Sequence, residues 1–180
     1  MRFSLCEDLL QCVLKIAMRE LNVVLFQPEI PQNTGNIVRT CAALGARLHL
    51  IRPLGFSMDD KHLRRAGLDY WHMVEIFYFD SLEEFLSAYP TGNFIFITKK
   101  ASLSYDQADF SGPVYLIFGR ETTGLPDEVL AKYKQNCFRI PMQAEARSLN
   151  LSNAVAVVAY ETCRRSGFKK LKLDGSAEFS

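Results

Sequence analysis

Three polar loops could carry chemistry in this chain, because each combines glycine or proline with side chains that donate, accept or carry charge. They span 28–39, 119–126 and 140–153, and each follows a short apolar run typical of a buried strand. Loops at the carboxyl ends of strands bind ligands in α/β proteins. The third loop enters a helix through Asn and Ser residues, whose neighbouring backbone N–H groups are free to bind a polar ligand. On its own this loop is more simply a well-capped core helix, and the two upstream loops favour the functional interpretation.

The elements that position these loops follow from the hydrophobic pattern. A first helix is expected after a cap at Asn33–Gly35 and should end at Gly45, and a second is expected over 58–67. A third should follow a capping box formed by Ser81 and Glu84, and a fourth should run from Pro126 to about Lys132. The last helix is expected from about Asn150 to Arg165 and should be buried on most sides. The segment 99–112 reads as irregular. Strands are predicted at 21–26, 47–51, 72–79, 93–98, 113–118 and 138–140. Strands that alternate with helices predict an α/β fold with a mainly parallel sheet.

Composition limits the class of protein. The chain has 180 residues, 48% of them hydrophobic, and a net charge of +1, so no global charge attracts nucleic acid or membrane. The five cysteines are odd in number and form no C-x-x-C pair, which suits the reducing cytoplasm. The three histidines have no metal-site spacing, so no metal is expected.

One domain is expected over 21–168, followed by a polar tail at 169–180. The leader at 1–20 contains an apolar run from Leu9 to Met18 that Lys15 interrupts and that is too short to span a bilayer. We interpret the leader as an extra amphipathic helix or an upstream start artefact, and we expect no membrane association.

Four basic residues have two open interpretations. Arg39 is expected in the first turns of its helix, where the dipole disfavours a cation, so it either has an anionic partner or is an ordinary solvated arginine. Lys61, Arg64 and Arg65 cluster on one short predicted helix, and such a charge run is more commonly a solvated face.

The chain lacks G-x-G-x-x-G, G-x-x-x-x-G-K-[ST] and G-x-S-x-G, so the common phosphate cradles and the nucleophile elbow are absent. The segments 31–39, 118–125 and 140–153 instead resemble the three motifs of the SPOUT methyltransferases, in the correct order. The match is closest to the TrmL group, which 2′-O-methylates the wobble nucleotide of certain tRNAs. The resemblance covers about 21–168, and the segment 59–70 is similar to one typical of that group.

The resemblance implies a parallel sheet whose C-terminal part is threaded into a trefoil knot, and S-adenosylmethionine as the cofactor. It also implies a homodimer that binds tRNA across both subunits, in the cytoplasm. The positions that match the family's cofactor contacts are Ile97, Gly119, Ile140 and Ser148, with Leu125 and Leu149 as neighbours.

The resemblance also suggests catalytic roles. A guanidinium is a poor base, so we expect Arg39 to hold the phosphate beside the target ribose. Tyr160 would accept or relay the hydroxyl proton, although a buried aromatic is an equally good interpretation. Glu121 would orient Arg39 or the knot loop, and Asn36 and Asn150 would fix loop geometry by hydrogen bonds.

In the same picture, Lys61, Arg64 and Arg65 would bind tRNA phosphates. The sequence departs from the group at Arg120, commonly Pro, at Thr123, frequently Arg, and at Leu149, commonly Met. Two alternatives stay open. The chain could methylate another tRNA position or another RNA, such as rRNA, or it could be a catalytically idle RNA-binding relative.

Overall fold

The structure is a computed structural model that describes residues 21–57, 70–169 and 171–174. The leader at 1–20, the predicted helix at 58–67 and the three predicted phosphate-binding residues Lys61, Arg64 and Arg65 lie outside the described residues. Within the part that is described, no helix is long and apolar enough to cross a membrane.

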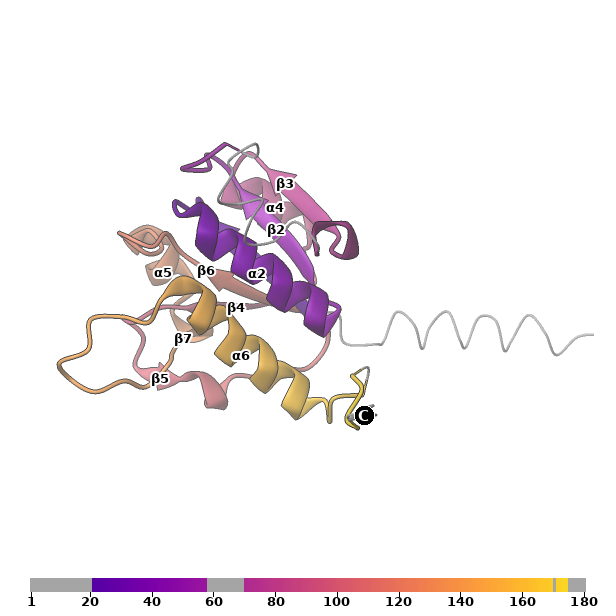
Figure 1. Cartoon of the computed structure of the whole chain (residues 1–180). Coiled ribbons are helices and arrows are strands. Elements are labelled where there is room, and N and C mark those ends of the chain that lie inside the picture. Colours follow the sequence, from indigo (N-terminus) through magenta and orange to yellow (C-terminus); the bar gives the residue numbers. More distant parts are fainter. Residues whose placement is uncertain (1–20, 58–69, 170, 175–180) are drawn as a thin grey trace, which may run out of the picture.

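A seven-stranded sheet forms the centre of the molecule, in the order β3-β2-β1-β6-β4-β7-β5 (Figure 1). Every strand pairing in it is parallel, which confirms the predicted α/β class. The strands are β1 (Leu21–Phe26), β2 (Arg47–Ile51), β3 (Ile76–Phe79), β4 (Asn93–Ile97), β5 (Leu103–Ser104), β6 (Val114–Phe118) and β7 (Cys137–Arg139).

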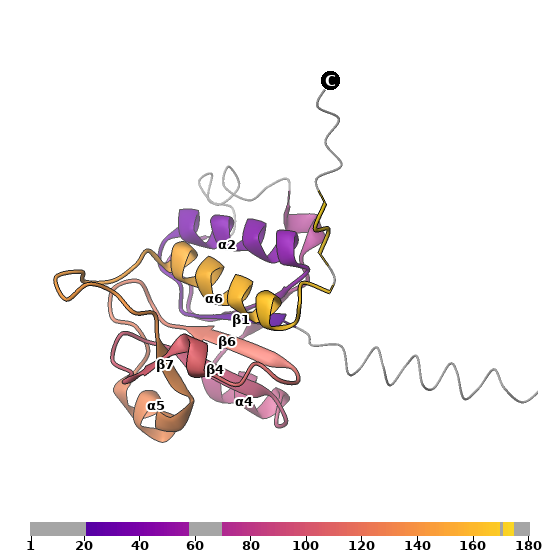
Figure 2. The same cartoon turned by 90° about the horizontal axis from the view of Figure 1, so that it is seen from below.

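Helices cover both faces of this sheet, which explains why its central strands are mainly apolar on both faces. The helices α2 (Pro31–Leu44) and α6 (Leu151–Arg165) lie side by side on one face, whereas α4 (Leu82–Ala88) and α5 (Asp127–Lys132) lie on the other (Figure 2). The residues of β1 and β6 are buried except for Phe26, which is half-buried. The described residues also contain three 3₁₀ turns, at Trp71–Met73, Tyr105–Gln107 and Lys134–Asn136.

The start of α2 differs from the prediction. The helix begins at Pro31 with Ile30 as its N-cap, because the fixed φ of proline suits the first helical position. The predicted cap at Asn33–Gly35 is therefore wrong, and these residues are buried in the first turns of the helix. Arg39 consequently lies in the third turn, beyond the reach of the dipole argument that first drew attention to it.

Other boundaries are closer to expectation. Asn150 is the N-cap of α6, accepting from the Ser152 N–H at 2.9 Å, and the Ser81 hydroxyl accepts from the Glu84 N–H at 3.1 Å, which confirms both predicted caps. The strand predicted at 72–79 is shorter and starts at Ile76. The segment 99–112, predicted as irregular, contains the short strand β5. The helix α6 is buried on one face only, because Asn153, Val157, Tyr160 and Arg164 form an exposed stripe.

Candidate functional site

A cavity of about 470 Å³ opens at the carboxyl ends of β4, β6 and β7. All three predicted loops contribute to its lining, as does the start of α2. The six residues that the family resemblance assigned to the cofactor all line it, namely Ile97, Gly119, Leu125, Ile140, Ser148 and Leu149. The structure thus brings these six positions, which are spread over some fifty residues of sequence, to one place.

The loop after β6 is a tight turn that only glycine permits. Arg120 and Gly124 exchange two backbone hydrogen bonds, of 3.2 and 3.0 Å, and Gly124 has φ +74°. A Cβ on Gly119 would lie 2.2 Å from the carbonyl carbon of Gly124 and 2.3 Å from the backbone nitrogen of Leu125. Since both clashing atoms are backbone, the loop cannot keep this shape with a side chain at position 119.

Glu121, at the tip of this turn, binds the start of α2. Its carboxylate accepts from the backbone N–H groups of Glu29 at 2.8 Å and Ile30 at 3.2 Å, and from the Asn33 side-chain amide at 3.0 Å. The N-cap residue of α2, Ile30, has no side chain that could accept a hydrogen bond. Glu121 therefore supplies, from 91 residues away, an acceptor for N–H groups at the start of a helix.

A second set of bonds runs between the same two loops in the opposite direction. The Thr122 backbone N–H and hydroxyl both donate to the Glu29 carboxylate, at distances of 2.8 to 3.0 Å. The loops that leave the neighbouring strands β1 and β6 are thus joined at the carboxyl ends of these strands. The space between the two loops is occupied by their mutual hydrogen bonds, and the cavity opens on the β4 and β7 side of β6.

The third loop joins the first through two asparagines. The Asn150 amide donates to the Asn33 side-chain oxygen at 2.9 Å, and the Asn150 oxygen accepts from the Ser152 N–H and hydroxyl. A continuous chain of side-chain bonds therefore runs from Glu121 through Asn33 to Asn150 and Ser152. It fixes the relative positions of three loops that are far apart in the sequence.

The remaining predicted residues lie elsewhere. Asn36 is exposed on α2, and its backbone carbonyl accepts from Thr40. Arg39 is exposed as well, with its guanidinium 5.0 Å from the centre of the Tyr70 ring. Tyr160 is 47% exposed on α6. Arg39 and Tyr160 are not among the residues that line the cavity within the described part of this chain.

Sequence reasoning missed several residues of the site. Asn33 was assigned only to a helix cap, although its buried side chain bonds to both Glu121 and Asn150. The cations Lys99 and Arg147 also line the cavity. Their positions could have identified both cations, because Lys99 is the second residue after β4 and Arg147 directly precedes Ser148, in segments where an α/β sheet predicts ligand-binding loops.

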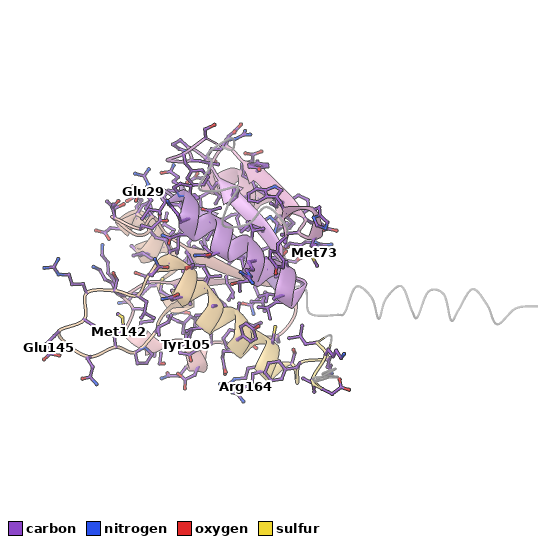
Figure 3. The ribbon with its side chains drawn as sticks, viewed as in Figure 1. Glu29, Met73, Tyr105, Met142, Glu145 and Arg164 are labelled. Atoms are coloured by element: carbon purple, nitrogen blue, oxygen red, sulfur yellow. The ribbon has the colours of Figure 1, made fainter. Side chains whose placement is uncertain are left out.

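The loop 140–150 projects away from the body of the molecule. Figure 3 shows Glu145 at its outer end and Met142 nearer the sheet, and Met142 lines the cavity. Residues 143–150 are all exposed.

The pKa of His49, on β2, has a structural explanation. Burial, with a smaller contribution from Arg47, lowers the pKa of His49 to about 4. That ring packs among the aromatic rings of Phe77, Phe85 and Tyr115.

In the described residues no group of three His, Cys, Asp or Glu side chains could hold a metal ion.

Comparison with known proteins places this geometry in context. The model of the SpoU rRNA Methylase family matches residues 20–160. The chain is 58% identical over 154 residues to a protein of Geobacillus stearothermophilus, covering 84% of this chain and 98% of the relative. It is 50% identical over 155 residues to the tRNA (cytidine(34)-2′-O)-methyltransferase of Yersinia pestis, covering 82% of this chain and 95% of the relative.

Solved structures agree with these matches. One that concerns the 2′-OH methylation of C/U34 on tRNA superposes with a TM-score of 0.79 at 48% identity, over 83% of this chain and 98% of that one. An AdoMet-bound rRNA methyltransferase from Sinorhizobium meliloti superposes with a TM-score of 0.74 at 29% identity, over 81% of this chain and 56% of that one.

Proposed function

The chain belongs to the SpoU methylase family, and from this we propose that it transfers a methyl group from S-adenosylmethionine to the 2′-hydroxyl of nucleotide 34, the wobble nucleotide of tRNA. The observation that carries the proposal is the cavity bounded by three loops that Glu121, Asn33 and Asn150 lock together. Relatives that match this chain over nearly their whole length are named for the same reaction, which supports nucleotide 34 as the target.

The cavity fits the proposed cofactor in size and chemistry. Small-molecule sites commonly enclose roughly 300–1,000 Å³ and are mainly apolar with a few polar groups. Here Ile97, Leu125 and Ile140 offer an apolar slot for an adenine, and the turn at Gly119 exposes backbone groups without a side chain in the way. S-adenosylmethionine, when bound, supplies an electrophilic methyl group.

The protein must hold the ribose and manage the hydroxyl proton. We propose that Arg39 binds the phosphate beside the target ribose, because its planar guanidinium suits bidentate phosphate binding and makes a poor base. The Tyr70 ring supports that guanidinium from one side. Tyr160 is proposed to accept or relay the proton, and Glu121 with Asn150 to position the loops.

A homodimer is part of the same proposal. Val157 and Tyr160 leave apolar surface exposed on α6, and Ile30 and Leu149 do so beside the cavity. A second copy of the chain packed on this region would cover that surface. It would also explain why Arg39 and Tyr160 face outward from their own subunit, since they would then lie at a subunit boundary.

We also propose the trefoil knot. Its support is connectivity, because β7 lies beyond β4, whereas α6, which follows β7, packs against α2, β1 and β6. The loop 140–150 therefore returns past β4 to reach α6. We further propose, from the sequence, that tRNA phosphates are bound by Lys61, Arg64 and Arg65. A cytoplasmic location is likewise proposed from the sequence.

Calorimetry with S-adenosylmethionine, followed by methyl incorporation into unmodified tRNA and into rRNA, tests the function. The proposal expects cofactor binding and incorporation into tRNA alone. Incorporation into rRNA would favour the alternative that the family name and the rRNA-modifying structural neighbour suggest. Binding without transfer to either RNA would indicate an idle RNA-binding relative.

A further inference from the structure

Two cations on the cavity have no carboxylate partner within the described part of the chain. Lys99 and Arg147 line the cavity, and neither of them forms an ion pair there. Two further cations of the lining have other partners, because Lys100 is neutralised by Asp127 and the Arg120 guanidinium lies 5.8 Å from the centre of the Phe26 ring, toward β1. We call Lys99 and Arg147 the cation rim.

Among the described residues, the one carboxylate that lines the cavity already has hydrogen-bond partners. Glu121 accepts from the N–H groups of Glu29 and Ile30 and from the Asn33 amide, so its lone pairs are directed at the start of α2. The rim is therefore a local surplus of positive charge on a chain whose net charge is only +1.

The proposed cofactor does not neutralise this surplus. S-adenosylmethionine carries an ammonium, a sulfonium and a carboxylate, so its net charge is itself positive, whereas the demethylated product S-adenosylhomocysteine is neutral overall. Bringing a cation into a positively rimmed cavity costs free energy unless an anion is bound nearby. The anion that the reaction brings is the phosphate backbone of the RNA.

We propose that the cation rim binds RNA phosphates at the mouth of the cavity, and that it couples RNA binding to binding of the positively charged cofactor. This inference rests on the proposed function. RNA phosphates neutralise the rim and so favour the cofactor, and by linkage the cofactor favours the RNA equally. After transfer the cofactor has lost its sulfonium charge, so the RNA complex no longer favours it.

The size of each contribution follows from Coulomb's law. Two unit charges separated by roughly 10 Å in a water-like dielectric change a binding constant about twofold, and salt weakens this further. Removing one rim cation should therefore strengthen S-adenosylmethionine binding to the free protein about twofold at low salt. The same change should leave the affinity for S-adenosylhomocysteine unaltered, because that molecule lacks the sulfonium charge.

The test compares Arg147→Gln and Lys99→Gln with Lys134→Gln, an exposed cation away from the cavity lining. Calorimetry measures both cofactor forms with and without an unmodified tRNA transcript, and tRNA affinity is measured against salt. Each rim variant should bind S-adenosylmethionine more tightly when free of RNA. Each should also bind the transcript more weakly, with a log–log salt slope flatter by roughly 0.7 to 0.9. Lys134→Gln should change neither quantity.

This opposite movement of two affinities is not expected from structural damage, which would weaken both. Two results would overturn the proposed role of the cation rim. In one, the rim variants lose affinity equally for both cofactor forms, and in the other they keep the wild-type salt slope of tRNA binding. A different result would refute the proposed methyltransferase function, namely a wild-type protein that binds no S-adenosylmethionine. A wild-type protein that methylates tRNA while the rim variants behave like Lys134→Gln would refute the rim alone.

Discussion

Replacing Glu121 with glutamine tests how the three loops are held together. The carboxylate accepts three hydrogen bonds, two from backbone N–H groups at Glu29 and Ile30 and one from Asn33. The glutamine amide has one oxygen and one NH₂ group, so it can keep the pair of bonds to Ile30 and Asn33 only by turning the NH₂ toward the Glu29 N–H. That arrangement places two donors face to face and removes the negative charge from the start of α2.

The expected cost follows from this count. A hydrogen bond to a charged group contributes about 1.5–3 kcal/mol, and leaving its donor unpaired adds desolvation. Glu121 is half-buried, so solvent compensates part of the loss. We expect Glu121→Gln to lower the free energy of unfolding by about 2 kcal/mol, and Glu121→Ala, which loses all three bonds, by more. Affinity for S-adenosylmethionine should fall in both variants because the cavity loops lose their connection to α2.

Urea unfolding, with the slope m as a check on two-state behaviour, measures this cost. The matched control is Glu128→Gln, which removes an exposed carboxylate from the first turn of α5 and so changes the same charge at another helix start. The control should change the stability by a few tenths of a kcal/mol. A Glu121→Gln protein with the same urea midpoint as Glu128→Gln would refute the structural role assigned to this carboxylate.

Three further changes have defined outcomes. Gly119→Ala should weaken S-adenosylmethionine binding at least about tenfold by calorimetry, because the new Cβ cannot avoid the backbone of Gly124; an unchanged affinity would contradict the geometry of the turn. Arg39→Lys should slow single-turnover methyl transfer about 10²-fold while cofactor affinity stays constant, because lysine keeps the charge and loses the bidentate geometry; recovery of the rate at alkaline pH would show instead that Arg39 acts as a base. Lowering the pH from about 6.5 toward 4 should cost about 3 kcal/mol of unfolding free energy, because burial lowers the pKa of folded His49 to about 4, so the unfolded chain takes up the proton first. His49→Gln should remove that slope in urea unfolding followed across this pH range, and a slope that persists in the variant would assign the effect to other groups.

Local pattern was enough to predict most of the fold. The apolar run at 21–26 is strand β1 as predicted, because its residues are buried between two helix layers. The caps at Ser81 and Asn150 were readable because each acts on an N–H two or three residues away. The start of α2 was misplaced because its polar residues look like a cap, whereas Pro31 already fixes the first turn and Glu121 accepts the free N–H groups from another loop.

Long-range bonding explains what the sequence could not predict about the site. The bond from Asn33 to Glu121 joins residues 88 apart, and the bond from Asn150 to Asn33 joins residues 117 apart. Nothing in the spacing of Asn33 and Asn36 tells which of them turns inward, and that depends on where the helix begins. The resemblance to known motifs did identify the six cavity residues, among them Ile97 and Gly119. It could do so because the motifs of a family reflect its whole fold, whereas a local pattern reflects only neighbouring residues.

Mapping the methylated nucleotide is the most direct test of the central proposal. The protein is incubated with S-adenosylmethionine and an unmodified tRNA pool, and the RNA is digested and sequenced by mass spectrometry. The proposal predicts a mass gain of one methyl group on the ribose of nucleotide 34 and at no other position, dependent on S-adenosylmethionine. A methyl group on a base, on another tRNA nucleotide or only on rRNA would contradict it.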